Sequence, residues 1–318
     1  MLKCAVYFPP QSLSHIGFPF FSEKPERLRI LGELFDEEKI PVILPKKAEL
    51  SSVLRAHTKE YIEHVESISK MSLIPATIAN ILSEYVQWYT RVSPGSYKAA
   101  LYAAGTVCQA VEDTIAGRYT RSFCAIRPPG HHAGREKGEG FCLFNNVAIG
   151  VLHAISLGYK RITVIDFDRH HGNGTQDIVS KNPYAKTLAD ILFVSSYQEG
   201  CKYSIESESN RNTGIVLVPL PEYCNGQHVV DTYKTRIIPV VHDFKPDLIF
   251  ISAGFDMHVS DPLTNIQMEA EDYYELTKLI TDASNTLCGG RVISVLEGGY
   301  NLPALKECVY YHLRALTN

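Results

Sequence analysis

The sequence has no run of about 20 apolar residues, so no segment is predicted to span a bilayer. Its amino terminus reaches Pro9 and Pro10 too early for the apolar core of a secretory signal. The eight cysteines are scattered and none forms a C-x-x-C pair, which excludes a zinc knuckle and a redox dithiol. We therefore expect an intracellular, cytoplasmic protein in a reducing setting with no membrane contact. A nuclear or exported location, directed by a signal that a receptor reads, is the alternative.

A strong excess of positive charge is also lacking. Lys and Arg number 31 against 35 Asp and Glu, a net charge of −4, so direct nucleic-acid binding is not expected. Hydrophobic residues make up 45% of the 318 residues and charged residues 21%, which allows a large core and excludes bulk disorder. Repeats, low-complexity tracts and Pro/Gly/Ser-rich linkers are absent from the sequence. We expect a single domain over residues 1–318.

Short β-branched runs alternate with longer helical patterns along the chain. Strands are predicted at residues 161–166, 191–195, 247–252 and 291–296. Each is apolar over several consecutive residues, as expected for strands that are covered on both faces. Helices are predicted at 96–116, 145–157 and 272–287, each followed by a glycine within two residues. This alternation predicts an α/β fold with a mostly parallel central sheet and helices on both faces.

Polar residues follow each of the four predicted strands. They are Asp166, Asp168 and His170, then Ser195, then Gly254 and Asp256, and finally the segment from Glu297 to Tyr300. In open α/β sheets, ligands bind beyond the carboxyl ends of the strands. We therefore predict a functional site at this edge of the sheet.

Asp166, Asp168 and His170 alternate along an extended segment, so their side chains are expected to share one face past the strand end. Carboxylate and imidazole groups suit a divalent metal of the zinc type. Asp256 would supply a further ligand from another strand, and two Asp and one His leave a coordination position open for catalysis. Turn and helix-cap roles are the alternative for these aspartates. Their combination with Asp256 and with a histidine pair favours the metal.

That histidine pair, His131 and His132, lies in the segment Arg-Pro-Pro-Gly-His-His-Ala-Gly at 127–134. Prolines fix backbone angles and glycines allow close approach, which indicates a positioned acid/base pair. Metal ligation is the less favoured alternative, because adjacent side chains are expected to diverge. Tyr300, within Glu-Gly-Gly-Tyr-Asn, would turn its phenol toward a developing oxyanion. An ordinary turn tyrosine is the alternative there.

These motifs resemble the histone deacetylase and acetylpolyamine amidohydrolase superfamily, which has an arginase-like α/β fold. The similarity extends from about Pro25 to Asn301 and rests on four segments. They are Pro-Pro-Gly-His-His-Ala-Gly at 128–134, Asp-x-Asp-x-His-His-Gly-Asn-Gly-Thr-Gln at 166–176, Ala-Gly-Phe-Asp at 253–256 with Asp-Pro-Leu at 261–263, and Glu-Gly-Gly-Tyr-Asn at 297–301.

The resemblance implies a role for each matching residue. Asp168, His170 and Asp256 would bind one catalytic zinc ion. His131 and His132 would be the active-site histidines, with Asp166 as the partner of His131 and Asn173 as the partner of His132. Tyr300 would polarise the substrate carbonyl. Gly140, Phe141 and Tyr203 would line the acyl tunnel, and Arg27 would lie near the cavity through which acetate leaves. A structural potassium ion is implied near Asp166, Asp168, His170 and Ser195.

The resemblance also implies hydrolysis of an N-acyl amide by metal-activated water, with His132 as the general base. A carboxylate partner favours the imidazolium form more than a neutral amide does. His131 beside Asp166 should therefore hold its proton more readily than His132 beside Asn173. Iron accepts the same ligands as zinc, so the choice of metal stays open.

The substrate is predicted less directly, because the sequence departs from the family pattern at the rim. Phe21 and Ser22 stand where His-Pro is usual, and Tyr89 holds the position of the aspartate that grips a peptide backbone. The favoured substrate is N-acetyl-lysine in a protein or peptide. A small acetylated amine such as an acetylpolyamine is the alternative, for which Glu84 and Glu139 are candidates for an acidic rim. Two further alternatives are less favoured. A non-catalytic acyl-group binder is disfavoured by the complete set of site residues. An arginase-type two-metal hydrolase is disfavoured by the lack of extra carboxylates for a second metal.

Overall fold

An eight-stranded sheet forms the centre of the computed structural model, which describes residues 4–17, 20–87, 89–181, 190–203 and 214–318. The strand order is β2-β1-β3-β8-β7-β4-β5-β6, and every neighbouring pair is parallel. The strands are β1 (Cys4–Tyr7), β2 (Val42–Ile43), β3 (Arg121–Cys124), β4 (Arg161–Asp166), β5 (Asp190–Gln198), β6 (Ile215–Leu220), β7 (Leu248–Ala253) and β8 (Val292–Leu296). The predicted α/β class with a parallel sheet is confirmed. The single-domain boundary stays a prediction.

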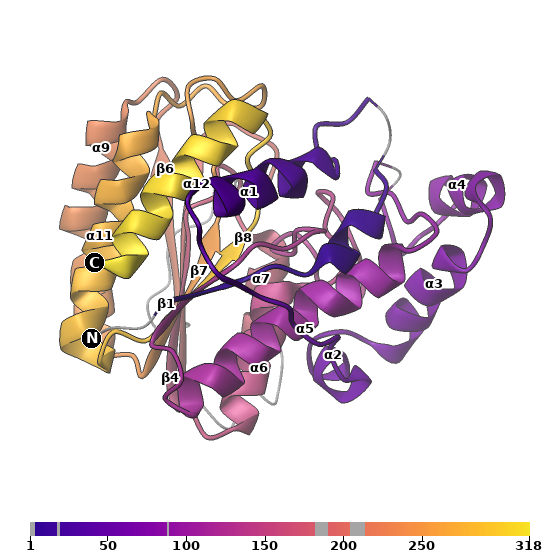
Figure 1. The fold of residues 1–318 in the computed structure, drawn as a ribbon, viewed down its shortest axis with the longest axis horizontal. Coiled ribbons are helices and arrows are strands. Elements are labelled where there is room, and N and C mark those ends of the chain that lie inside the picture. Colours follow the sequence, from indigo (N-terminus) through magenta and orange to yellow (C-terminus); the bar gives the residue numbers. More distant parts are fainter. Residues whose placement is uncertain (1–3, 18–19, 88, 182–189, 204–213) are drawn as a thin grey trace.

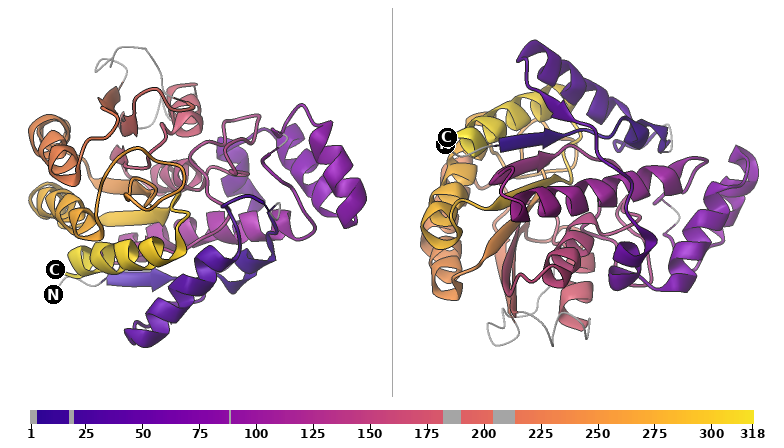
Figure 2. Two further views of the ribbon diagram at one scale, coloured as in Figure 1. Left: turned by 90° about the horizontal axis from the view of Figure 1, so that it is seen from above. Right: turned by 60° about the horizontal axis from the view of Figure 1, so that its bottom comes forward.

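Helices cover both faces of this sheet, as predicted (Figures 1 and 2). One face packs against α1 (Glu26–Glu37), α9 (Gly226–Thr232), α10 (Ile238–Phe244), α11 (Ala270–Cys288) and α12 (Leu302–Thr317). The other face packs against α2 (Leu50–Ala56), α3 (Lys59–Ser69), α5 (Ser96–Ile115), α6 (Asn146–Ser156) and α7 (Asn173–Lys181), with α4 (Leu73–Ile81) beside α3. Among the residues that the structure describes, no helix is both long and apolar enough to cross a membrane.

The central strand β7 shows why the predicted strands lack a polar face. Phe250 belongs to the core under α5 and α6, whereas Ile249 and Ile251 belong to the core under α11 and α12. All three side chains are fully buried. Because both faces are covered, an apolar residue is favoured at every position of the strand. The four strands predicted from such runs are all present, and β5 continues beyond its predicted end to Gln198.

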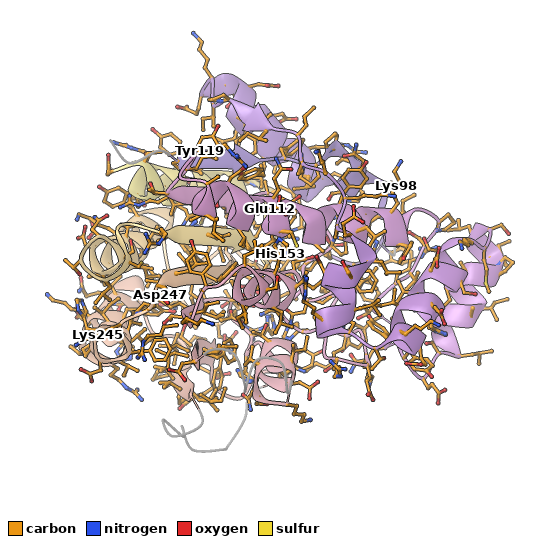
Figure 3. The ribbon with its side chains drawn as sticks, turned by 90° about the horizontal axis from the view of Figure 1, so that it is seen from below. Lys98, Glu112, Tyr119, His153, Lys245 and Asp247 are labelled. Atoms are coloured by element: carbon orange, nitrogen blue, oxygen red, sulfur yellow. The ribbon has the colours of Figure 1, made fainter. Side chains whose placement is uncertain are left out.

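The three predicted helices are also present, as α5, α6 and α11, and local capping fixes their ends. The side chain of Asn145 caps α6 by accepting a hydrogen bond from the backbone N–H of Ala148 at 2.9 Å. α5 ends at Ile115, just before Gly117 takes a left-handed φ of 68°. Glu112 of α5 lies 3.1 Å from His153 of α6, so the two helices also meet at their surface (Figure 3).

Candidate metal-dependent active site

Polar residues from different strands meet at the carboxyl edge of the sheet, as expected. The backbone N–H of Gly298, after β8, donates to Asp168 Oδ2, after β4, at 2.8 Å. The backbone N–H of Arg169 donates to Asp256 Oδ1, after β7, at 2.9 Å. These bonds place residues that are about 90 to 130 positions apart in one buried cluster.

The cluster contains a set of side chains that fits a metal ion. Asp168, His170 and Asp256 each place a ligand atom within 4.8 Å of the others. His170 Nδ1 lies 3.1 Å from both Asp168 Oδ1 and Asp256 Oδ2. Asp256 Oδ2 is buried, and no hydrogen bond of good geometry reaches it from the described residues. A buried carboxylate oxygen is costly unless a cation or donor satisfies it, so this set fits a divalent ion of the zinc type.

Two glycines leave the space that this group needs. A Cβ on Gly298 would lie 2.5 Å from Asp168 Oδ2 and 2.6 Å from Asp256 Oδ2. A Cβ on Gly254 would lie 2.1 Å from Asp168 Oδ2. Any side chain at either position would therefore displace a carboxylate of the cluster.

Asp166 does not join this group, although the alternation along the chain placed it on the same face. Its Oδ2 lies 3.1 Å from His131 Nδ1, and its Oδ1 accepts the backbone N–H of Asp168 at 3.1 Å. Burial raises the pKa of Asp166 to about 6, although the charge of His131 opposes that rise. Asp166 is thus placed as the partner of His131, as the resemblance implied.

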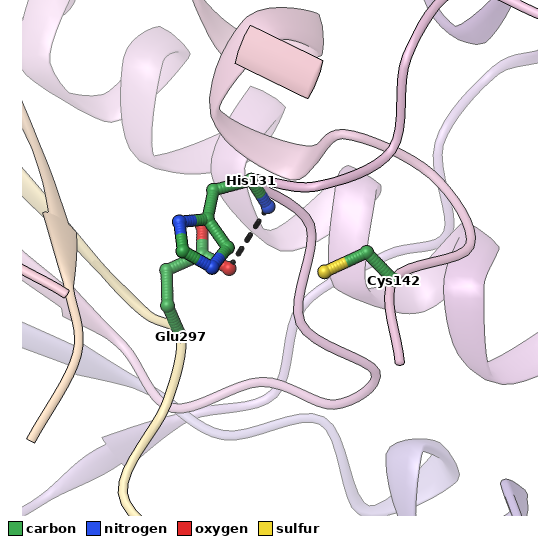
Figure 4. A group of neighbouring side chains, drawn as sticks. All are labelled: His131, Cys142 and Glu297. Carbon is green, nitrogen blue, oxygen red and sulfur yellow. Dashed lines mark hydrogen bonds between the residues drawn. The ribbon is translucent and has the colours of Figure 1, made fainter. Parts of the chain in front are cut away.

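His131 and His132 lie side by side, with ring centroids 4.0 Å apart. The expectation that their side chains diverge is wrong. They lie on a loop, where the alternation of a strand does not apply. Glu297 Oε2 fixes this loop by accepting the backbone N–H groups of Gly130 at 2.7 Å and His131 at 3.1 Å (Figure 4).

The two histidines differ in protonation because their surroundings differ. Burial disfavours the charged form of both rings. At His131 the carboxylates of Asp168 and Asp166 outweigh burial and raise the pKa to about 10. At His132 burial and the charges of His131 and His170 hold the pKa well below its usual value. His132 Nδ1 lies 2.7 Å from Asn173 Oδ1, the neutral partner that the resemblance implied. The arrangement provides one protonated imidazole beside one neutral imidazole.

A second group of metal-ligand types, His131, Cys142 and Glu297, also lies within 4.8 Å (Figure 4). Burial raises the pKa of Glu297 to about 7 and holds the pKa of the Cys142 thiol well above its usual value. A metal needs ionised thiolate and carboxylate ligands. The group therefore suits a metal less well than the Asp168 cluster, and Glu297 acts as a brace for the histidine loop. No local sequence pattern indicates this brace, because Glu297 lies 166 residues from His131.

Tyr300 and Arg27 are linked through the segment that follows β8. The backbone N–H of Tyr300 donates to Asp261 Oδ2 at 2.7 Å. Arg27 is fully buried and donates to the carbonyl oxygens of Gly299 at 2.6 Å and Glu297 at 2.5 Å. Its guanidinium carbon lies 5.0 Å from the centre of the Tyr300 ring. Arg27 therefore supports the segment that carries Tyr300, while its place beside an acetate exit stays a prediction.

The three residues expected to line a tunnel surround His132 and Tyr300. The ring of Tyr203 lies 4.1 Å from that of His132 at an interplanar angle of 31°. The ring of Phe141 lies 5.9 Å from that of Tyr300. Gly140 has a φ of +57°, and a Cβ there would lie 2.1 Å from His132 Cδ2. Glycine is required at this position both for its backbone angle and for its contact.

Comparison with known proteins identifies the family. The model of the histone deacetylase domain matches residues 21–316. The chain belongs to the histone deacetylase family. It is 36% identical to type-2 histone deacetylase 2 of Dictyostelium discoideum over 93% of this chain and 20% of that protein. It is 33% identical to a probable deacetylase of Archaeoglobus fulgidus, over 93% of this chain and 81% of that protein.

Structural comparison agrees with this assignment. The crystal structure of the HDA15 HD domain matches with a TM-score of 0.85 and 29% identity, over 99% of this chain and 90% of that chain. A histone deacetylase-like amidohydrolase of Pseudomonas aeruginosa is 30% identical over 94% of this chain and 76% of its own length. Histone deacetylases are hydrolytic enzymes and are generally zinc-dependent, which agrees with the Asp168 cluster.

One implied site in this histone deacetylase domain has less support. Ser195 aligns with Asp166 in the parallel register of β4 and β5, but its hydroxyl lies 2.9 Å from His171 Nδ1. Potassium binding by Asp166, Asp168, His170 and Ser195 stays a prediction. His171 faces Ser195, so it does not add a ligand to the Asp168 cluster.

Proposed function

We propose that this chain is a zinc-dependent deacetylase that hydrolyses an N-acyl amide, with N-acetyl-lysine of a protein or peptide as the favoured substrate. The observation that carries the proposal is the meeting of two groups at one sheet edge. Asp168, His170 and Asp256 form the metal-ligand cluster. His131, whose ring carries a raised pKa, and His132, whose pKa is lowered, lie beside it.

The side chains have complementary roles in this reaction. An ion held by the cluster would supply Lewis-acid polarisation of the amide carbonyl and of the attacking water. His132 is neutral, so it accepts the proton of that water. His131, beside Asp166, holds a proton that stabilises the negative charge that develops. A histidine of the pair then protonates the leaving amine as the C–N bond breaks, which releases the acyl group as a carboxylate. Burial holds the pKa of Tyr300 well above its usual value, so its hydroxyl remains a hydrogen-bond donor to the oxyanion.

Charge at the rim favours acetyl-lysine over a cationic polyamine. The hydroxyl of Tyr89 lies 2.5 Å from that of Tyr203, and Lys202 Nζ lies 3.9 Å from the centre of the Tyr89 ring. A positive charge therefore stands beside the tyrosine that stacks on His132. It repels a substrate cation. The carboxylate of Glu139, expected at an acidic rim, accepts hydrogen bonds from the side chains of Asn173 and Gln87.

A substrate panel with and without a chelator tests the proposal. The full chain is assayed on an acetyl-lysine peptide and on N-acetylputrescine, and its metal content is measured in parallel. We expect one zinc per chain, faster turnover of the peptide, loss of turnover on chelation and recovery with zinc. Faster turnover of acetylputrescine would favour the small-amine alternative. One metal without hydrolysis of either substrate would favour an acyl-group binder, and two metals an arginase-type hydrolase.

Two aspartate variants sharpen the test. D256N removes a carboxylate from the cluster, whereas D243N changes an exposed aspartate at the end of α10. We expect D256N to lose bound zinc and turnover together, and D243N to keep both. Wild-type zinc content in D256N would contradict the assignment of the cluster.

A further inference from the structure

Glu139 lies behind the histidine pair. Its Oε1 accepts a hydrogen bond from Asn173 Nδ2 at 2.6 Å. The oxygen of the same amide, Asn173 Oδ1, lies 2.7 Å from His132 Nδ1. Gln87 Nε2 donates to the second carboxylate oxygen, Glu139 Oε2. A continuous chain of hydrogen bonds therefore runs from Gln87 through Glu139 and Asn173 to His132.

The carboxylate sets the direction of each bond in this chain. An ionised carboxylate only accepts hydrogen bonds, so Asn173 must turn its NH2 group toward Glu139 and its oxygen toward His132. An amide oxygen also only accepts, so the bond to His132 requires a proton on Nδ1. The neutral ring then has its lone pair on Nε2. This tautomer leaves Nε2 free to take a proton from water.

We propose that Glu139 is a positioning residue that acts through Asn173 to select the tautomer of His132 that works as a base. The inference rests on the proposed function of His132 as general base. Without Glu139, the Asn173 amide is free to rotate by half a turn and present its NH2 group to Nδ1. The neutral ring would then carry its proton on Nε2, and that nitrogen would no longer be a base.

The backbone and a tyrosine hold this chain in place. The backbone N–H of Gln87 donates to the carbonyl oxygen of Gly138 at 3.0 Å. The backbone N–H of Gly138 donates to the carbonyl oxygen of Tyr85 at 2.8 Å. The hydroxyl of Tyr203 donates to Gln87 Oε1 at 3.3 Å, while its ring stacks on His132. These hydrogen bonds and the Tyr203 ring surround the His132 ring, which restricts the movement of both His132 and Asn173.

Alanine substitution provides the first test. Loss of a hydrogen-bonding partner behind a catalytic group typically reduces activity by roughly 10- to 100-fold. We expect E139A to lower kcat on the acetyl-lysine peptide by this factor, with KM within about threefold of wild type and one zinc still bound. The control is E136Q, an exposed glutamate on the same loop, with wild-type kcat. A kcat for E139A within twofold of wild type would overturn the inference.

A charge exchange tests the direction of the hydrogen bond between residues 139 and 173. N173D places a second carboxylate against Glu139, and neither can donate, so we expect kcat to fall at least about 10-fold. In N173D/E139Q the glutamine NH2 group donates to the new carboxylate, whose other oxygen accepts from His132 Nδ1. The new carboxylate partner favours the imidazolium form of His132, so we expect the double variant to recover most of the lost kcat at pH values where that ring is neutral. A double variant no more active than N173D across the pH profile would contradict the proposal.

Nitrogen-15 NMR of the His132 ring provides a readout that does not depend on turnover. In the zinc-loaded wild-type chain we expect the proton of the neutral ring on Nδ1. In E139A we expect a mixture of the two tautomers. An unchanged tautomer in E139A would overturn the role of Glu139, even if E139A has a lower kcat than the wild type. Conversely, an Nδ1 proton in a chain that hydrolyses no acyl amide would refute the proposed function and leave the tautomer selection standing.

Discussion

Replacing Gly298 with alanine tests whether the carboxylates of Asp168 and Asp256 must share one ion. The added Cβ would lie 2.5 Å from Asp168 Oδ2 and 2.6 Å from Asp256 Oδ2. Non-bonded heavy atoms pack favourably at about 3.5 Å, so each carboxylate must retreat by roughly 1 Å. Gly298 does not have a positive φ, so alanine adds no backbone strain. A misplacement of about 1 Å at a catalytic site costs on the order of 100-fold in rate.

We therefore expect G298A to lower kcat/KM on the acetyl-lysine peptide by about 100-fold, and to bind zinc more weakly. The assay combines kinetics at saturating zinc with equilibrium dialysis against a zinc buffer. G32A is the matched control, because its Cβ in α1 would make an ordinary contact of 3.5 Å with Phe8 Cζ. If G298A kept wild-type zinc affinity and kcat/KM, the two carboxylates would not share an ion and the reasoning would fail.

Four further substitutions perturb the histidine pair, the rim and the core. H132A should abolish turnover while elemental analysis still finds one zinc, and an active metal-loaded variant would reject the general base. D166N removes a carboxylate that stabilises protonated His131, so the pKa of His131 should fall. The alkaline limb of the kcat/KM profile should then move to lower pH; an unmoved limb would contradict the pairing. K202E should raise the ratio of acetylputrescine to peptide turnover, and an unchanged ratio would remove the rim argument. F250A empties a fully buried position in β7 and should lower the free energy of unfolding by about 3–5 kcal/mol in urea denaturation; a loss under 1 kcal/mol would show that the site relaxes.

The strands that the sequence predicted share one physical property, which is cover on both faces. β4, β5, β7 and β8 read as continuous apolar runs for that reason. β3 does not read as a continuous apolar run, because it begins with Arg121, which is charged and yet buried. Its guanidinium donates to the carbonyl oxygen of Leu316 at 3.0 Å and to Asn285 Oδ1 at 2.9 Å. These partners lie more than 160 residues away, so no local pattern predicts that an arginine finds hydrogen-bond partners inside the sheet.

Some residues of the candidate site could likewise be predicted from local patterns, whereas others depend on distant contacts. Asp168, His170 and Asp256 follow apolar strands, and strand ends of a parallel sheet meet at one edge, so their proximity could be predicted. The geometry of the histidine pair could not, because Glu297 braces that loop from 166 residues away. From the sequence, Glu139 is a candidate only for an acidic rim. Its contact with Asn173 depends on how the loop folds back against α7, which neither periodicity nor spacing encodes.

Zinc reconstitution of the metal-free chain shows whether hydrolysis depends on one ion at the Asp168 cluster. The chain is stripped with a chelator, and hydrolysis of the acetyl-lysine peptide is followed as zinc is added back in known amounts. A single ion held by Asp168, His170 and Asp256 predicts activity that rises linearly and levels off at one zinc per chain. Full activity in the stripped chain, or a plateau reached only at two zinc ions per chain, would contradict it.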